Sequence, residues 1–441
     1  MTSLTRRHFF HSAGMALTAA QATRVMGAND KVQVGIVGLG RRGTAHVGTY
    51  MTLTNEATVT ALCDVNQAAL ERAQTTVERT TQHKPKGYAD LRELFADKNV
   101  DAVSMPVPNH WHALATIWAC QAGKDVYVEK PACYNIFEGT KMIEAARKYQ
   151  RMVQIGSQGR SSLNRQRAVQ LLHEGVIGKM YMARGLCFNR RKSIGHMADA
   201  PIPPGLDWDK FLGPAPMRPY NELRFNYNWH WFWDTGNGDI GNQGPHQLDI
   251  AHWGFGRPGL PKAVFSTGGK YVYVDDQETP NTQIATYDYG DAEMVFEVRG
   301  ILTGSEGGIS NNTATGTVGD LFYGSDGWMA MSQSGFQVYK GEKGEKIMDE
   351  VSPRRSGDGG NAPHFLNFLQ AVRSRNYKEL NADVEIGVLA ADLAHLANIS
   401  YRLGRKLAFD PKTLTFPSDA EANRMLTRQQ YRAPYIVPDK V

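Results

Sequence analysis

The motif Glu129-Lys130-Pro131 places a basic side chain directly after a short apolar run, Asp125–Val128. That run predicts a buried strand, so Lys130 would lie at the strand's carboxyl end. Partial burial lowers the pKa of a lysine, and such an amine can exchange a proton with a substrate hydroxyl during hydride transfer. The alternative is an ordinary surface lysine at a strand end.

A second group of candidate residues lies further along the chain, where Asn242, His246 and Asp249 are spaced four and three residues apart. The pattern becomes helical at Gly244–Trp253, and the spacing predicts that all three side chains lie on one helix face. Imidazole titrates near neutral pH, so His246 is the candidate general acid or base, with a purely structural histidine as the alternative.

Three tryptophans occur within five residues in the segment 229–233. In an extended segment these alternate side chains would share one face, and aromatic faces stack on sugar C–H groups while indole N–H groups bind hydroxyls. The alternative is an aromatic contact between domains. The residues expected to bind substrate are Gln158, Trp229, Trp231, Trp233, Asp239 and Asp249.

The run Pro108-Asn109-His110-Trp111-His112 follows another apolar segment. Asn109 is expected to cap a helix that begins near His112. Either histidine is expected to face a cofactor or to be structural. The His-x-His spacing is compatible with zinc, but no third ligand lies nearby in the sequence, so no metal site is predicted.

A cofactor site is indicated by the stretch that begins with the apolar run Val32–Val37 and continues into a G-x-G-x-x-G motif at residues 38–43. The glycines would allow a tight turn, close approach of a pyrophosphate and helix packing, and the following helix would direct its N–H groups at the phosphates. A second strand, Ala57–Cys63, ends at Asp64, 21 residues after Gly43, where a carboxylate binds ribose hydroxyls. That carboxylate would repel a 2′-phosphate, so NAD is predicted and NADP is disfavoured; the alternative is a tight turn in an unrelated α/β protein. The expected cofactor-binding residues are Gly38, Gly40, Arg41, Arg42, Gly43, Asp64, Pro108, Asn109, His112, Glu129 and Lys130.

Alternating strand and helix patterns over residues 29–155 predict a Rossmann-type doubly wound parallel sheet. Helices are expected near 67–80, 90–96, 112–122 and 136–149, with strands at 102–106, 125–128 and 152–155. Ligands of such sheets lie outside the carboxyl ends of the strands. The Gly38 turn, the Asn109 loop and the Lys130 loop are therefore expected to share one rim.

Residues 156–408 predict an α+β domain with a largely antiparallel sheet. The pattern predicts helices at 165–174, 363–374 and 384–403, strands at 180–188, 263–267, 283–289 and 292–298, and loops at 303–318 and 352–362. A long aromatic-rich stretch, 189–235, is expected to be irregular but ordered. The tail, 409–441, is expected to wrap the surface or a neighbouring subunit.

The first 28 residues are similar to a twin-arginine export signal, with Arg6-Arg7 followed by a short apolar run and small-residue cleavage sites. The run is too short for a membrane span, so no stable membrane insertion is predicted. A periplasmic or otherwise exported location is expected, or a cytoplasmic one if the leader is not functional.

The length, the charge and the cysteine content of the chain indicate which classes of partner and which cysteine chemistry to expect. A chain of 441 residues predicts two domains, and the net charge of +5 comes partly from leader arginines, with no basic run that would follow a nucleic-acid backbone. No nucleic-acid partner is predicted. The four cysteines, Cys63, Cys120, Cys133 and Cys187, have neither disulfide-framework nor metal-ligand spacing and are expected to be buried thiols.

These motifs together resemble the Gfo/Idh/MocA family of dinucleotide-dependent oxidoreductases, with the glycine turn, Asp64, Pro108-Asn109-x-x-His112, Glu129-Lys130-Pro131 and the block Gly241 to Asp249 in the family's order. The resemblance implies a Rossmann domain joined to a domain with an open, mostly antiparallel sheet, and a homo-oligomer, dimer or tetramer. It also implies a carbohydrate substrate and catalytic roles for Lys130 and His246. Many members carry Asp where this chain has Asn242, so Asp239 or Asp249 is a candidate to supply the missing charge.

Three functions are compatible with the sequence. The first is an exported NAD-dependent oxidoreductase acting on a sugar hydroxyl, with a tightly held cofactor, in which Lys130, His246 and Asn242 form the catalytic set. The second is an NAD-dependent glycoside hydrolase that oxidises, eliminates, adds water and reduces again. The third is a non-catalytic sugar-binding protein on a degenerate oxidoreductase fold, for which the Asn at position 242 is the main support.

Overall fold

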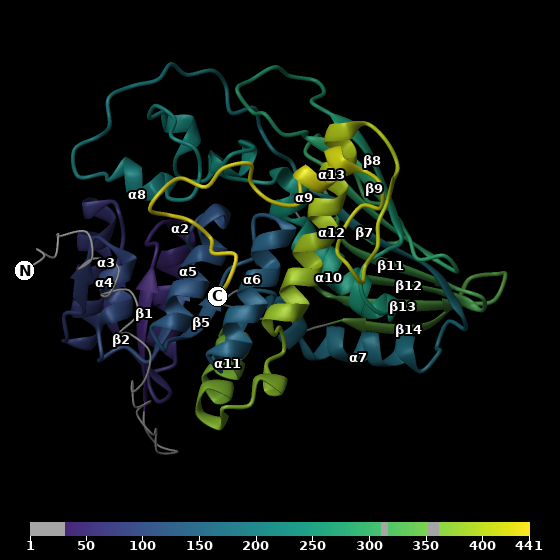
Figure 1. The fold of residues 1–441 in the computed structure, drawn as a ribbon. Helices are drawn as coiled ribbons and strands as arrows, with labels where there is room; N and C mark the ends of the chain where they lie inside the picture. Colours follow the sequence, from purple (N-terminus) through teal and green to yellow (C-terminus); the bar gives the residue numbers. More distant parts are fainter. Residues whose placement is uncertain (1–30, 310–315, 352–360) are drawn as a thin grey trace, which may run out of the picture. The chain divides into compact units, whose positions relative to one another are not determined.

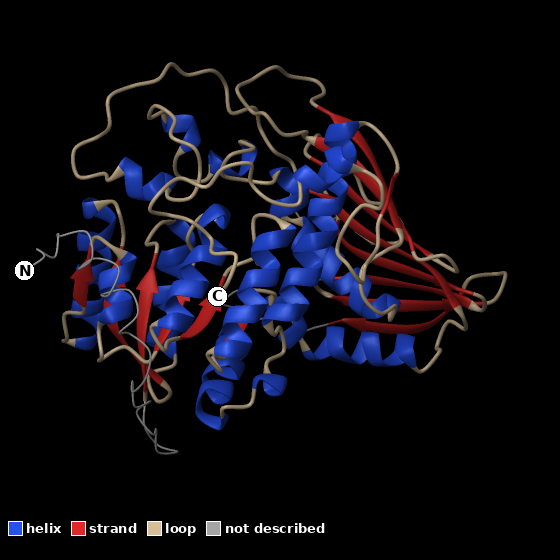
Figure 2. Ribbon diagram, viewed as in Figure 1, coloured by secondary structure: helices blue, strands red, loops and turns tan. Residues whose placement is uncertain are grey.

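The computed structural model describes residues 31–309, 316–351 and 361–441. The predicted leader lies outside the described residues, as do parts of the predicted loops at 303–318 and 352–362. The described chain contains two β-sheets with helices packed against them (Figures 1 and 2). No helix within the described ranges is both long enough and apolar enough to cross a bilayer.

The first sheet has six strands, all parallel, in the order β3-β2-β1-β4-β5-β6. The central strands are buried almost throughout because helices cover both faces. Its strands are β1 (Val32–Val37), β2 (Ala57–Cys63), β3 (Lys86–Tyr88), β4 (Ala102–Met105), β5 (Asp125–Val128) and β6 (Val153–Ile155). Its helices are α2 (Arg41–Thr52), α3 (Gln67–Thr81), α4 (Leu91–Ala96), α5 (Asn109–Gln121) and α6 (Ile136–Lys148). The predicted Rossmann-type sheet is therefore confirmed.

The second sheet has nine strands in the order β14-β13-β12-β11-β7-β10-β9-β8-β15, and every pairing is antiparallel except that of β7 with β10. Helices α7, α10 and α12 lie on one face of this sheet (Figures 1 and 2). The strands are β7 (Met180–Phe188), β8 (Ala263–Gly269), β9 (Thr282–Asp288), β10 (Glu293–Arg299), β11 (Val318–Gly324), β12 (Gly327–Ser332), β13 (Gly335–Lys340), β14 (Glu345–Val351) and β15 (Leu407–Ala408). This is the open, mostly antiparallel sheet that was expected.

The remaining elements connect these sheets or pack on them. The α-helices are α7 (Leu163–His173), α8 (Trp208–Leu212), α9 (Gly238–Asn242), α10 (Gly244–Phe255), α11 (Ala362–Ser374), α12 (Val384–Leu403) and α13 (Ala420–Arg424). The 3-10 turns are η1 (Gln158–Ser161), η2 (Glu222–Arg224), η3 (Asn228–Trp231) and η4 (Tyr377–Glu379). The stretch 189–235 is irregular apart from α8, η2 and η3, as predicted.

Strands β11 to β14 were not predicted from the sequence. Their glycines, among them Gly319, Gly327 and Gly335, have low β-propensity and obscure the alternating pattern. The strands form because β11 pairs with β7 along its length and each later strand pairs with the one before it. The pairing of β11 with β7, which lies far earlier in the chain, leaves no local sequence signal.

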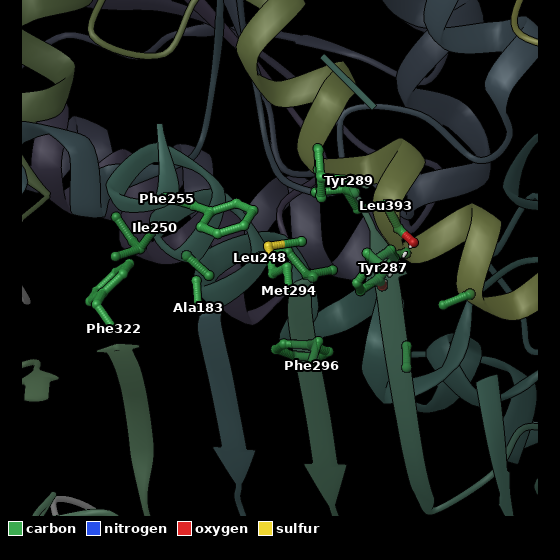
Figure 3. Close-up of a cluster of buried hydrophobic side chains, with 14 of the residues drawn as sticks. Ala183, Leu248, Ile250, Phe255, Tyr287, Tyr289, Met294, Phe296, Phe322 and Leu393 are labelled. Carbon is green, nitrogen blue, oxygen red and sulfur yellow. Dashed lines mark hydrogen bonds between the residues drawn. The ribbon is translucent and has the colours of Figure 1, made fainter. Parts of the chain in front are cut away.

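Helix α12 contributes to the cores of both sheets. Its first half, with Val384 and Val388, packs in the core of the six-stranded sheet, and its second half, with Leu393 and Leu396, packs in the core of the nine-stranded sheet. In the latter core, the Tyr287 hydroxyl donates a hydrogen bond of 3.0 Å to the Leu393 carbonyl (Figure 3). Asp383 caps this helix by accepting from the Glu385 N–H.

The tail packs on its own chain. Phe409 and Phe416 lie in the core of the nine-stranded sheet, whereas Tyr435 and Val437 lie in the core of the six-stranded sheet. The Arg432 side chain also donates to the Asp209 and Ala215 carbonyls. The tail was expected to wrap the surface or a neighbouring subunit, and the structure adds that several of its apolar residues enter the two cores of its own chain.

We expect Leu393→Ala to lower the free energy of unfolding by about 2–5 kcal/mol, because the leucine is 0% exposed in a packed core. Leu163→Ala is the matched control, since that helical leucine is 74% exposed and its loss should change stability by at most about 0.5 kcal/mol. Urea denaturation followed by circular dichroism measures both variants. Equal midpoints for the two variants would contradict this account of the core.

Candidate active site

The glycine turn between β1 and α2 has the shape of a dinucleotide cradle. Gly38 adopts φ +89°, and a Cβ on Gly43 would lie 2.0 Å from the Gly38 carbonyl oxygen, so both positions require glycine. A Cβ on Gly40 would meet nothing within 4 Å. The backbone at Gly40 therefore faces open space at the start of α2, where helix N–H groups favour a phosphate.

Asp64 lies beside this cradle at the end of β2. The Leu39 N–H donates to one carboxylate oxygen at 2.5 Å, and the Asn66 N–H donates to the other at 2.7 Å. Burial raises the pKa of Asp64, and these backbone hydrogen bonds oppose that shift. Each oxygen keeps further acceptor capacity for a hydroxyl, so the residues present fit the ribose and pyrophosphate of a dinucleotide.

The two arginines of the glycine motif point to different surroundings. Arg41 is exposed at the first position of α2, whereas Arg42 turns away and pairs with Glu129 at 2.8 Å. Arg42 also donates to the Asn361 side chain at 3.3 Å. The Arg42–Glu129 pair thereby links the glycine turn to the loop after β5. The Arg42 guanidinium is engaged in this pair and is not free to bind a phosphate.

Glu129 is 6% exposed and accepts from three side chains on other elements. Besides Arg42, these are His46, whose Nε2 lies at 3.1 Å, and Gln158, whose Nε2 donates at 3.0 Å. Burial alone would raise the pKa of Glu129, but Arg42 and His46 outweigh it and hold that pKa well below its usual value. Glu129 is thus an ionised, paired carboxylate.

The Asn109 loop differs from the expectation. Helix α5 begins at Asn109 itself, so Asn109 does not cap it; the Asn109 Nδ2 donates to Asn237 Oδ1 at 2.5 Å. Pro108 holds the capping position without a side-chain hydrogen bond. The reason is that the buried Asn237 amide, remote in sequence, competes for the Asn109 side chain.

Neither histidine of the Pro108–His112 run faces an open site. His110 lies with its ring nitrogens 3.3 Å from the Thr235 carbonyl oxygen and 2.9 Å from that of Phe211. His112 lies 2.6 Å from the Pro131 carbonyl oxygen and 2.8 Å from that of Val107. Burial lowers the pKa of both imidazoles, that of His110 to about 3. The expectation that one faces the cofactor is corrected: His112 joins the loops after β4 and β5.

Lys130 reaches from the loop after β5 to the second domain. Its Nζ donates to the Asn242 backbone carbonyl at 2.7 Å and to Asn242 Oδ1 at 3.0 Å. Burial lowers the pKa of Lys130 to about 8, with Glu129 and Asp239 opposing and Arg42 and Arg191 reinforcing the shift. An amine of this pKa exchanges protons readily at neutral to mildly basic pH.

His246 lies in the first turn of α10, partly exposed. Burial, followed by the nearby Lys130 ammonium, lowers the pKa of His246 well below its usual value. No hydrogen-bond partner for its ring is found among the described residues. A neutral imidazole of this kind can both donate and accept, so it is free to bind a substrate oxygen beside Lys130.

The predicted single helix face for Asn242, His246 and Asp249 is wrong. The helix is interrupted after α9. Asn242 is therefore the last residue of α9, whereas His246 and Asp249 lie on α10. Asp249 is 3% exposed, and both its oxygens accept from Arg160 at 2.7–2.9 Å. A substrate contact by Asp249 is therefore not supported, because its carboxylate is occupied.

Asp239 is the acidic residue that the structure places near Lys130. It is 2% exposed, pairs with Arg191 at 3.0 Å and contributes to the electrostatic environment of Lys130. Of the two acids considered as replacements for the one missing at position 242, Asp239 has the better geometry. Asp239 affects Lys130 through its charge, because its carboxylate oxygens accept their hydrogen bonds from Arg191.

The three tryptophans do not form one aromatic face. Segment 228–231 is the 3-10 turn η3, so the alternation of an extended chain is lost. Trp231 is buried, Trp229 stacks on the His230 ring at 3.5 Å, and Trp233 lies 5.0 Å beneath the Arg402 guanidinium. The expected sugar-stacking platform is corrected because η3 sends the three rings into different surroundings.

Three residues at the site were missed by the sequence reasoning: Tyr227, His230 and Arg191. The Tyr227 hydroxyl accepts from Asn242 Nδ2 at 2.9 Å, and the Tyr227 ring lies 4.6 Å from that of His230. The Arg191 guanidinium lies 6.0 Å from the Tyr227 ring. The aromatic and basic richness of the long irregular stretch was the available signal, but it did not single out positions.

The comparisons agree with the fold and the motifs. Residues 32–157 match the Gfo/Idh/MocA oxidoreductase family model for the NAD-binding Rossmann fold, and residues 187–308 and 339–437 match its C-terminal alpha/beta domain. The chain belongs to the Gfo/Idh/MocA oxidoreductase family, and its cradle is that of a nicotinamide dinucleotide.

Curated relatives match over part of their length. The chain is 28% identical over 211 residues to the Glycosyl hydrolase family 109 protein 1 of Shewanella sp. (strain ANA-3), covering 41% of this chain and 45% of that one. It is 28% identical over 184 residues to a Glycosyl hydrolase family 109 protein of Saccharopolyspora erythraea, covering 40% of each. The chain thus spans less than half of these relatives.

Solved structures share the whole fold at low identity. The WlbA dehydrogenase from Bordetella pertussis, in complex with NADH and UDP-GlcNAcA, is 18% identical with a TM-score of 0.65, covering 86% of this chain and 99% of that one. Levoglucosan dehydrogenase, in complex with NADH and levoglucosan, is 16% identical with a TM-score of 0.64 and the same coverage. At such identities the likeness shows the fold alone.

We expect Gly40→Ala to fold normally but to bind NAD at least tenfold more weakly, a loss of about 1.4 kcal/mol, because its methyl group would enter the space meant for the pyrophosphate. Gly48→Ala is the matched control on the same helix, since a Cβ there also meets nothing within 4 Å. Tryptophan-fluorescence titration with NAD and thermal melting measure the two effects. Unchanged NAD affinity in Gly40→Ala would contradict the cradle assignment.

Proposed function

We propose that the protein is an NAD-dependent oxidoreductase that transfers a hydride to or from a hydroxyl-bearing carbon of a sugar or sugar derivative. The observation that carries this proposal is Lys130, an amine with its pKa lowered to about 8, at the carboxyl end of β5. This strand belongs to the same parallel sheet as β1, which leads into the glycine cradle, with β4 between them. Asn242, His246 and Tyr227 surround it with groups that bind hydroxyls. The bound nicotinamide would accept or supply the hydride.

NAD is proposed over NADP because of Asp64. Both of its carboxylate oxygens are held by backbone N–H groups beside the cradle, so the charge is fixed where a 2′-phosphate would lie. Arg42, a basic residue of the glycine motif, is engaged with Glu129. A carboxylate in this position favours two ribose hydroxyls over a phosphate.

We also propose that the protein is exported by the twin-arginine route and keeps its cofactor. A location outside the cytoplasm offers no dependable pool of free NAD, so the net reaction would be redox-neutral or coupled to a second sugar. The protein expressed without its first 28 residues and purified without added nucleotide should release about one NAD(H) per chain on denaturation, measured by absorbance and mass spectrometry. Nucleotide-free protein would refute a retained cofactor.

A homo-oligomer is proposed from the uncovered face of the nine-stranded sheet. Tyr181 on β7, Phe265 on β8 and Ile284 on β9 expose 52%, 41% and 38% of their surface. Strands β8 and β9 are neighbours, and β10 separates β9 from β7. An apolar surface of this kind supports burial against a second copy, as a dimer or tetramer. Light scattering on the purified protein measures the number of chains.

The second candidate is a redox-neutral glycoside hydrolase. It is favoured by the partial matches to Glycosyl hydrolase family 109 proteins. Oxidation of a sugar hydroxyl by Lys130 and the cofactor would be followed by elimination of the glycosidic oxygen, addition of water and return of the hydride. Release of an aryl aglycone that requires NAD but leaves no net NADH would establish this function.

The pH dependence tests the role of Lys130. Because only the neutral amine can accept the hydroxyl proton, the rate of sugar-dependent reduction of bound NAD should rise tenfold per pH unit below about pH 8 and level off above it. Lys130→Met should lower the rate by about 10²–10⁴-fold. Stopped-flow absorbance of NADH measures both.

Lys98→Met is the control for Lys130→Met, since Lys98 is an exposed lysine of the same domain. It should leave the rate and its pH profile unchanged. A rate in Lys130→Met equal to that of the unmodified protein would remove Lys130 from the catalytic set. If instead the unmodified protein shows no sugar-dependent reduction of bound NAD, sugar-dependent changes in cofactor fluorescence test the non-catalytic sugar-binding alternative.

A further inference from the structure

Tyr227 has an accessible hydroxyl-bearing side chain at the site. It lies just before η3 and is 42% exposed. Its ring packs 4.6 Å from the His230 ring, with the Arg191 guanidinium 6.0 Å from its centroid. These contacts hold the ring in place while leaving one side of it open to a ligand.

Asn242 links Tyr227 to Lys130. The Lys130 Nζ donates to Asn242 Oδ1 at 3.0 Å, and Asn242 Nδ2 donates to the Tyr227 hydroxyl oxygen at 2.9 Å. The orientation of this amide follows from chemistry, because an ammonium has only donors and must face the amide oxygen. The amine and the hydroxyl are therefore bridged by one amide group, the amine at its oxygen and the hydroxyl at its nitrogen.

In this orientation the hydroxyl proton of Tyr227 is not donated to Asn242. The hydroxyl oxygen accepts from Asn242, and no described residue accepts a hydrogen bond from its O–H. A carboxylate at position 242 would reverse the direction of this hydrogen bond, because it has no N–H to donate and would itself accept from the tyrosine hydroxyl. Asparagine thus leaves a directed donor next to Lys130.

We propose that Tyr227 is a further catalytic residue whose hydroxyl donates a hydrogen bond to the reacting oxygen of the substrate, and that Asn242 is the positioning residue that leaves this donor free. The proposal rests on the proposed oxidoreductase function. During oxidation the substrate O–H bond breaks and its proton passes to the Lys130 amine, while the hydride leaves the same carbon for the nicotinamide and a C=O bond forms. Tyr227 keeps its own proton throughout and stabilises the negative charge that develops on the oxygen.

The protonation state of Tyr227 agrees with this role. Burial of its hydroxyl end raises the pKa of Tyr227, with Arg191 opposing that shift. The phenol therefore remains protonated where Lys130 has lost its proton. Two adjacent groups, one accepting a proton and one donating a hydrogen bond, suit an oxygen that changes from hydroxyl to carbonyl.

The first test is Tyr227→Phe, which keeps the ring contacts and removes only the hydroxyl. We expect kcat and kcat/KM for sugar oxidation to fall together by on the order of 10²-fold, because the lost hydrogen bond acts in the transition state. Tyr181→Phe is the matched control, since this 52% exposed tyrosine lies on the outer sheet face. A rise in KM with unchanged kcat would overturn the assignment to the reacting oxygen.

The second test is Asn242→Asp, alone and with Tyr227→Phe. The carboxylate should shift the pH profile to higher pH by favouring the Lys130 ammonium, and should lower the plateau rate by drawing the Tyr227 proton to itself. In the Tyr227→Phe background the same change should shift the profile but leave the plateau where Tyr227→Phe has it. Independent, multiplying losses, or a faster Asn242→Asp enzyme, would overturn the proposal.

The two proposals fail in different ways. If the unmodified protein with bound NAD shows no sugar-dependent absorbance at 340 nm across a panel of free sugars and glycosides, the oxidoreductase function fails. If it is active and Tyr227→Phe is equally active, only the role of Tyr227 fails. Melting temperatures of all variants, measured alongside, separate loss of the hydroxyl from loss of the fold.

Discussion

The buried carboxylate of Glu129 is the interaction on which the rest of the site depends. It receives Arg42 from the helix of the glycine turn, His46 from the next turn of that helix and Gln158 from η1. A buried charge is costly unless it is paired, so α2 and η1 are both held to one position relative to β5, the strand that Glu129 follows. Lys130 follows Glu129 directly, and its position is set by the same constraint.

The backbone around Glu129 is adapted to this pairing. A Cβ on Gly156 would lie 2.7 Å from the Glu129 carboxyl carbon, so the carboxylate packs directly over the glycine at the end of β6. On the other side, His112 joins the carbonyls of Val107 and Pro131, the loops after β4 and β5. The cofactor cradle and the catalytic amine are thus positioned by one continuous set of contacts along the strand ends.

The second domain completes the site through few residues. Lys130 is anchored by Asn242 at the end of α9, and α12 packs in both cores, which holds that contact in register. Asn242 carries no charge beside the amine, and the burial that lowers the pKa of Lys130 is opposed by Glu129 and, to a smaller extent, by Asp239. The same amide donates a hydrogen bond to the Tyr227 hydroxyl oxygen, which a carboxylate could not do.

Local patterns were sufficient for the first domain because each strand and its helix are adjacent in sequence and show clear periodicity. The predicted strands 32–37, 57–63 and 125–128 match β1, β2 and β5 at both ends. The second domain was predicted less well. Strands β11 to β14 are held by pairing with β7 and with each other, and η3 replaces the extended chain that the spacing of Trp229, Trp231 and Trp233 predicted.

The sequence by itself determined the Rossmann fold, the nicotinamide cradle and the candidacy of Lys130, because glycine spacing, a following acid and strand-end motifs are local features with direct physical meaning. Only the tertiary structure decided which polar residues meet at Lys130. It brings Tyr227 and Asn242 to the amine, pairs Asp249 with Arg160 and sends His112 to backbone carbonyls. The physical reason is that a buried polar group must find a partner, and which partner it finds depends on packing between segments that here lie 15 to 112 residues apart in the chain.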